Sequence, residues 1–249
     1  MSTHKLRVLF LLFPIFVLSQ VNKTKEINKQ TQTWISLNTV TKFNDHWGAI
    51  ADAHLRSNDF FDQNSFYFLR GGIRYFVNPS INITVGYAHM WLAPTKDGWT
   101  TYSDESRIYQ QVQLSSKIGK VSMLQRIRNE QRWNEKIVNN AETGGNRFSD
   151  RIRYLLSFDI PVFKKKTAPT LVISDELLIQ FGKEMVYNTF DQNRLFIGIK
   201  QSISPKLSFD FGYMNVYQQK ITGYQYDINH TVRLFFYLNT NLKSKSNTK

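Results

Sequence analysis

The chain has 249 residues, a formal net charge of +13, no cysteine, and an aromatic-rich composition with 12 Tyr and 19 Phe. The lack of cysteine excludes disulfides, thiolate metal sites and a lipid-modified N-terminal cysteine, and the length fits one all-β domain. The charge would ordinarily suggest nucleic-acid binding, but Lys and Arg are scattered instead of forming one basic stripe, so we expect no nucleic-acid partner.

The N-terminal residues 1–19 are predicted to be a signal peptide. A basic start at 4–7 precedes a mostly apolar run at 8–18, and residues 17–19 resemble a small-residue cleavage site. A retained membrane anchor is the alternative, but the run is shorter than the roughly 20 residues of a spanning helix, and Pro14 interrupts it. The polar residues 20–31 are interpreted as a periplasmic lead-in or a weak first strand.

After this lead-in, segments of alternating apolar and polar residues follow one another without a linker. The alternation predicts about eleven strands of roughly 10–14 residues. Their ranges are 32–43, 47–56, 65–77, 81–92, 105–117, 121–135, 150–163, 169–182, 191–202, 206–219 and 226–239.

The clearest alternation lies in the sixth of these segments. Successive side chains of a strand point to opposite faces, so Ile127 faces away from the four charged residues of this segment, Arg126, Arg128, Glu130 and Arg132. The next segment repeats the pattern, with Arg151 and Arg153 opposite the apolar residues Ile152, Tyr154, Leu156 and Phe158. Charged residues on one face and large apolar residues on the other are typical of a membrane-spanning barrel wall.

The sequence therefore predicts an all-β, antiparallel up-and-down transmembrane β-barrel over residues 32–240, followed by a basic tail at 241–249. Short turns alternate with longer loops, such as those expected at 93–104 and 135–148, as in barrels with short periplasmic turns and long outer loops. Bacterial barrels have even strand counts, so twelve strands are the first choice and ten the second.

A soluble, exported β-sandwich is the alternative fold, because its strands also alternate. Two features favour the barrel. The predicted strands are longer than the roughly five or six residues of ordinary strands. Four Trp residues near predicted strand ends are expected to form an interfacial aromatic girdle: Trp34, Trp47, Trp91 and Trp133.

Several motifs of the chain resemble a known family. These are Glu105-x-Arg107, Arg126-x-Arg128-x-Glu130-x-Arg132, Arg151-x-Arg153, Asp175-Glu176, the run from Phe190 to Arg194, and Gly212-Tyr213. Together they are similar to the domain of unknown function 2490 family, predicted outer-membrane proteins common in Bacteroidetes-like bacteria, over about residues 32–237. The resemblance implies an outer-membrane barrel and supplies no activity.

The predicted inward face collects a charge lattice, and an unpaired charge in a dry interior is costly. Either a salt-bridged lattice fills the lumen and fixes strand register, or the Arg excess lines a narrow passage or pocket that attracts anions; both hold if the lattice leaves a gap. The predicted lattice consists of Arg56, Arg70, Arg74, Glu105, Arg107, Arg126, Arg128, Glu130, Arg132, Arg151, Arg153, Asp159, Glu176, Arg194, Asp210 and Arg233.

No catalytic residue is predicted. His54, His89 and His230 lie on or near predicted strands, and none has a Ser or carboxylate at a spacing that indicates a triad. His89 falls on the apolar face at a strand end and is predicted to be a girdle residue. No metal-ligand spacing, phosphate loop or nucleotide fingerprint occurs, so we expect no cofactor and no metal, and a barrel enzyme is the less favoured alternative.

The sequence thus predicts a bacterial outer-membrane protein of unassigned biochemical role, surrounded by outer-membrane lipid. One hypothesis is a narrow, porin-like, Arg-lined pore for small anionic solutes. The other is a closed structural or surface-interaction barrel with a salt-bridged lumen, and the sequence indicates no particular protein partner.

Overall fold

The alternating segments form long strands in the computed structural model, which describes residues 23–94, 96–165 and 167–242. The predicted signal peptide at 1–19 and the tail residues 243–249 lie outside the described residues. The strands are β1 (Glu26–Lys42), β2 (Trp47–Asn58), β3 (Gln63–Phe76), β4 (Ile81–Leu92), β5 (Ser103–Ile118), β6 (Val121–Val138), β7 (Ala141–Ile160), β8 (Thr170–Phe181), β9 (Phe190–Ser202), β10 (Leu207–Gln219) and β11 (Gln225–Asn241).

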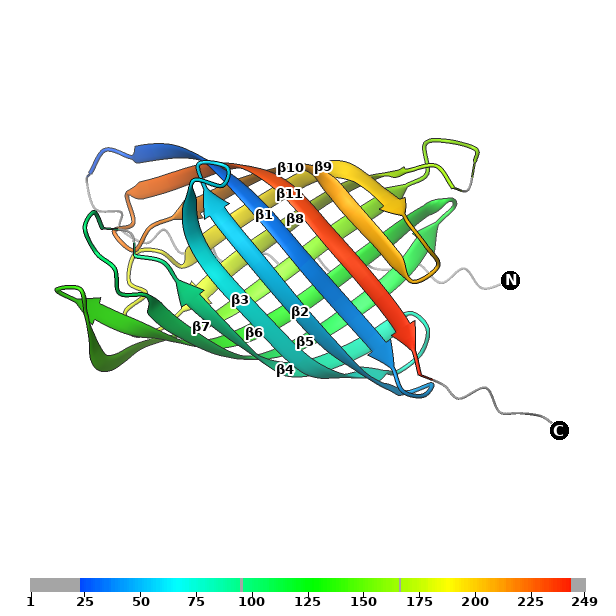
Figure 1. Ribbon diagram of the computed structural model, residues 1–249, viewed down its shortest axis with the longest axis horizontal. Coiled ribbons are helices and arrows are strands. Elements are labelled where there is room, and N and C mark those ends of the chain that lie inside the picture. The colour runs from blue at the N-terminus through cyan, green and yellow to red at the C-terminus, as the bar shows by residue number, and fades with distance from the viewer. Residues whose placement is uncertain (1–22, 95, 166, 243–249) are drawn as a thin grey trace, which may run out of the picture.

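Each strand pairs antiparallel with its neighbours in the chain, and β1 pairs with β11 to close the barrel (Figure 1). The described residues therefore form one closed sheet, not the two packed sheets of a sandwich. The closing pair is parallel, with Trp34 opposite Arg233. The described residues form eleven strands, in place of the twelve or ten that were predicted. In an up-and-down barrel with an even number of strands, the first and last strands are antiparallel, whereas β1 and β11 run in the same direction.

The connections divide between the two ends of the barrel. We call the end with the connections after β1, β3, β5, β7 and β9 the turn end, and the opposite end the loop end. β1 starts at the loop end, within the predicted lead-in, and β11 finishes at the turn end.

The predicted loop at 135–148 is wrong, because β6 and β7 continue through it as a hairpin that extends beyond the barrel (Figure 1). Asn139 and Asn140 form its two-residue turn, with φ of 54° and 60°. Two consecutive positive φ angles match the right-handed twist of paired strands, and Asn tolerates them better than most residues. Strand pairing therefore continues past the expected strand end, with a register shift between Glu135 and Ile137.

The outer wall of the barrel carries large apolar side chains. Ile127 is 56% exposed, and Val85 and Leu69 are each 53% exposed. Exposed apolar side chains gathered in this way are typical of an interaction surface. Within the residues that the structure describes, no helix has the length and hydropathy of a membrane span.

The interior is tightly packed where glycines face a buried tyrosine. Gly72 and Gly86 lie opposite each other on β3 and β4. The Tyr109 side chain of β5 is 1% exposed, and its hydroxyl lies 2.6 Å from the position that a Cβ on Gly86 would occupy. The two glycines therefore make the room that Tyr109 fills.

Candidate functional site: a charged lumen

The lumen contains a cavity of about 1110 Å³ that is lined by residues from all eleven strands. Its lining reaches from Pro79 and Ser80 at the turn end to Met185 and Ile221 at the loop end. The cavity therefore extends along the barrel axis and is the candidate functional site.

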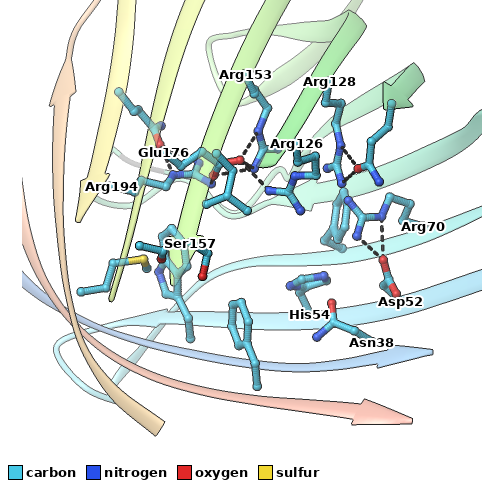
Figure 2. Close-up of a pocket in the computed structure, with 18 of the residues that line it drawn as sticks. Asn38, Asp52, His54, Arg70, Arg126, Arg128, Arg153, Ser157, Glu176 and Arg194 are labelled. Atoms are coloured by element: carbon cyan, nitrogen blue, oxygen red, sulfur yellow. Dashed lines mark hydrogen bonds and ion pairs between the residues drawn. The ribbon is translucent and has the colours of Figure 1, made fainter. Parts of the chain in front are cut away.

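The structure places every charged residue of the predicted lumen lattice inside the barrel. All of them line the cavity except Glu130, which is 2% exposed and lies behind its arginine partners. Figure 2 shows Arg126, Arg128 and Arg153 on one side of the cavity, across from His54. The strand alternation read from the sequence thus gives the correct facing for this set.

Glu130 on β6 is the most densely paired carboxylate of the lumen. It accepts hydrogen bonds from Arg153 Nη1 at 2.8 Å and Arg128 Nη1 at 3.4 Å, and from Arg151. Arg107 Nη1 lies 3.7 Å from Glu130 Oε2, the oxygen that also accepts from Arg151. One buried carboxylate therefore connects strands β5, β6 and β7 through four guanidinium groups.

Glu176 on β8 is a second buried carboxylate that pairs with several arginines. Its oxygens accept hydrogen bonds from Arg153 Nη2 at 2.8 Å and from Arg126 Nη2 at 2.7 Å, and Arg194 Nη1 lies at 3.3 Å. Arg153 bridges Glu130 and Glu176, so the two groups form one lattice across β5 to β9. Guanidinium groups suit this role because they present several donors in a fixed plane.

Two further carboxylates of the lumen, which were not predicted from the sequence, also pair with arginines. Asp52 of β2 pairs with Arg70, whose Nε lies 2.7 Å away. Asp52 is four residues from Arg56 on one strand, so alternation could have placed it inside. Asp191 accepts a hydrogen bond from Arg151 Nη1 at 2.9 Å, but it lies at a register shift between β8 and β9. Such a bulge breaks simple alternation, so spacing from Arg194 gives the wrong facing.

Two arginines line the cavity without a carboxylate partner among the described residues. The Arg74 guanidinium donates from Nε to Thr84 Oγ1 at 3.1 Å. The Arg56 guanidinium carbon lies 3.3 Å from the Trp34 ring centroid and 4.4 Å from that of Phe66. Arg56 Nε is buried and has no hydrogen-bond partner in the described protein.

This contact corrects the prediction that Trp34 belongs to the aromatic girdle. Trp34 is 5% exposed and packs inside the barrel against Phe196, Met214 and Val216. β1 begins at Glu26, so Trp34 lies in the middle of the strand and not near its end, and its parity is that of the lumen. Trp47, Trp91 and Trp133 do belong to the outer wall, where they contact Tyr75, His89 and Phe148.

The family model described as protein of unknown function, DUF2490, matches residues 31–227. The chain belongs to this family. The match confirms the family resemblance seen in the alternating charged motifs, whereas the bacterial group stays a prediction. No curated protein and no solved structure matches the chain.

At the loop end of this DUF2490 barrel, Glu184 joins the β8–β9 connection to the β6–β7 hairpin. It accepts hydrogen bonds from Lys136 Nζ at 2.8 Å and Arg147 Nε at 3.3 Å. These bonds, chiefly the one from Lys136, hold the pKa of the Glu184 carboxyl below its usual value. The contact keeps the hairpin beside the mouth of the cavity.

The described residues of this DUF2490 barrel contain no group of three or more His, Asp or Glu residues arranged to hold a metal ion. His54 lies in the lumen between Phe68 and Phe235, with ring centroids 4.9 and 5.7 Å away. The guanidinium groups on the cavity wall can attract anions electrostatically.

Proposed function

We propose that this DUF2490 protein is an outer-membrane β-barrel whose arginine-rich lumen binds and passes small anions. The observation that carries the proposal is Arg56, a half-buried arginine on the cavity wall whose buried Nε lacks a protein partner. A desolvated cation without a carboxylate is costly, and a small anion entering the cavity would offset that cost.

The apolar outer wall supports the proposed location. An Arg or Lys on the lipid face of a barrel costs roughly 2–4 kcal/mol at the midplane. Arg128 and Glu130 of β6 are 3% and 2% exposed and point inward, while Ile127, next to Arg128, points outward. A wall built this way suits lipid on one side and water or ions on the other. Cell fractionation tests the location, and recovery of the mature protein in a soluble periplasmic fraction would contradict it.

The balance of charge in the lumen supports anions over cations. The carboxylates Glu105, Glu130 and Glu176 each pair with two or more arginines. Arg56 and Arg74 remain outside these pairs on the described cavity wall. In a narrow, low-dielectric passage such an excess of positive charge focuses the field and raises the local anion concentration.

A closed structural barrel is the second candidate, and the dense lattice around Glu130 favours it. Steady current through the detergent-purified protein in a planar lipid bilayer separates the two candidates. A conducting lumen gives discrete current steps whose size depends on salt concentration. A lumen blocked by its lattice gives no steady current, and that result would overturn the pore.

A further inference from the structure

The outer wall near the loop end brings together a serine, a histidine and an aspartate. His89 of β4 lies opposite Ser106 of β5, and Asp104 lies opposite Trp91 in the same pairing. His89 Nδ1 is 3.4 Å from Ser106 Oγ, and His89 Nε2 is 3.5 Å from Asp104 Oδ2. The imidazole thus lies between a hydroxyl and a carboxylate, one at each ring nitrogen.

This order matches a nucleophile, a base and an orienting carboxylate. A proton on Nε2 directed at Asp104 leaves the Nδ1 lone pair free to accept the Ser106 hydroxyl proton. Both distances exceed those of a tight hydrogen bond, as catalytic contacts often do without substrate. Tyr87 lies beside the pair, with its hydroxyl 2.8 Å from Ser106 Oγ and 3.3 Å from His89 Nδ1.

An apolar groove on the outer wall leads to this cluster. The hollow, of about 570 Å³, is lined by Leu37, Ala51, Ala53, Leu69, Gly71 and Trp91, together with Tyr87 and His89. The residues Ala51, Ala53 and Gly71 are exposed and small, so they form a low floor between larger neighbours. Strand pairing places Ala53, Leu69, His89 and Ser106 in one row across β2 to β5.

We propose that Ser106, His89 and Asp104 form a serine esterase site that cleaves acyl esters of membrane glycerolipids. The groove over β2 and β3 holds the acyl chain and places its ester carbonyl at Ser106. The choice of a membrane lipid as substrate rests on the proposed location, because only there does lipid surround the outer wall. The hydrolytic chemistry itself rests on the side-chain geometry alone.

The reaction balances with water as the second reactant. Ser106 Oγ bonds to the ester carbonyl carbon while His89 Nδ1 takes the hydroxyl proton. The Tyr87 hydroxyl donates a hydrogen bond to the resulting oxyanion. The carbon–oxygen bond to the lipid alcohol then breaks, and His89 returns the proton to the leaving alkoxide. Water, deprotonated by His89, releases the fatty acid from Ser106 and restores the site.

A girdle role alone, as predicted from the sequence, would explain the Trp91 contact of His89 but not the serine and carboxylate on its two nitrogens. A second outer-wall histidine provides the comparison. His230 of β11 is bonded through Nδ1 to the Tyr213 hydroxyl at 2.7 Å. No serine or carboxylate contact of His230 occurs in the described part of the chain. His230 is therefore the matched control for His89.

The test uses the full mature chain purified in detergent micelles, with a medium-chain p-nitrophenyl ester and then phosphatidylcholine in mixed micelles as probes. Ser106→Ala and His89→Asn should each lower the hydrolysis rate by about 10²–10⁴-fold, whereas His230→Asn should leave it unchanged. A fluorophosphonate probe should label Ser106 in the wild type and in His230→Asn, but not in Ser106→Ala. Retained heat-modifiable mobility on gels shows that each variant is folded.

Asp104 acts through His89, so its variants need a separate readout. Asp104→Asn should lower kcat with little change in KM, and Asp104→Glu should restore part of kcat. Hydrolysis by the wild type that Ser106→Ala does not lower, or no hydrolysis and no fluorophosphonate labelling in the folded wild type, would overturn the proposal. Because Ser106 lies on the outer wall, Ser106→Ala should leave bilayer conductance unchanged, so failure of the esterase and failure of the pore are distinguishable. Hydrolysis of the p-nitrophenyl ester without hydrolysis of phosphatidylcholine would overturn the lipid substrate.

Discussion

The guanidinium carbon of Arg56 lies 3.3 Å from the centroid of the Trp34 ring inside the barrel. A second guanidinium, that of Arg194, lies 5.2 Å from the same ring. The electron-rich face of an indole stabilises a nearby cation, but it does not replace a carboxylate. Trp34 therefore holds Arg56 in place on the cavity wall while leaving the cation able to attract an anion.

Replacing the two members of this contact should change stability to different extents. Trp34→Ala should lower the free energy of unfolding by about 3–5 kcal/mol, because it removes a buried aromatic side chain. Arg56→Gln should change stability little, since it also removes an uncompensated charge. Urea unfolding in lipid vesicles measures both. Greater destabilisation by Arg56→Gln than by Trp34→Ala would show that Arg56 is primarily structural.

Glu130 should be the most sensitive carboxylate of the lattice. Glu130→Gln leaves the guanidinium groups of Arg107, Arg128 and Arg151 without their shared negative charge. Breaking a buried ion pair in this way costs roughly 3–5 kcal/mol. The control is Glu142→Gln, at an exposed position of the β6–β7 hairpin. Equal urea midpoints for the two variants would contradict the lattice.

The glycines that face Tyr109 offer a test of packing. A Cβ on Gly86 would collide with the Gly71 carbonyl oxygen and would lie 2.6 Å from the Tyr109 hydroxyl, whereas a Cβ on the outward Gly71 would lie 3.9 Å from its nearest neighbour. Gly86→Ala should therefore destabilise the barrel by about 1–3 kcal/mol through overpacking. Gly71→Ala should be close to neutral in the same urea titration. A larger loss of stability for Gly71→Ala than for Gly86→Ala would contradict tight packing on the lumen side of these strands.

Alternation in the sequence predicts the strands and their facing well, because each wall residue meets either the lumen or the outside. Ile127 and Arg128 are placed correctly by this rule. This rule does not predict the facing of Asp191, because a β-bulge adds one residue at this point of β9 and no local sequence pattern indicates the bulge. Local sequence patterns also do not predict that β1 and β11 pair with each other or that the pair is parallel. The contact of His89 with Ser106 depends on the register between β4 and β5, which sequence spacing does not determine.

Adjacent cysteines on β7 should report opposite surroundings. The chain has no native cysteine, so Leu156→Cys and Ser157→Cys each create a unique thiol. Ser157 lines the cavity, and Leu156 has the opposite parity. A lipid-soluble maleimide should label position 156 in vesicles, and a small charged thiol reagent should label position 157. Labelling of both positions by the lipid-soluble reagent would contradict a wall with lipid on one side.

The sign of the reversal potential across a potassium chloride gradient tests the anion-selective lumen most directly. The purified protein is placed in a planar bilayer, and the voltage of zero current is measured for the wild type and for Arg56→Gln. A lumen with unpaired Arg56 and Arg74 gives a potential with the sign set by chloride, and Arg56→Gln shifts it toward zero. A potential set by potassium, or one that Arg56→Gln leaves unchanged, would contradict the account.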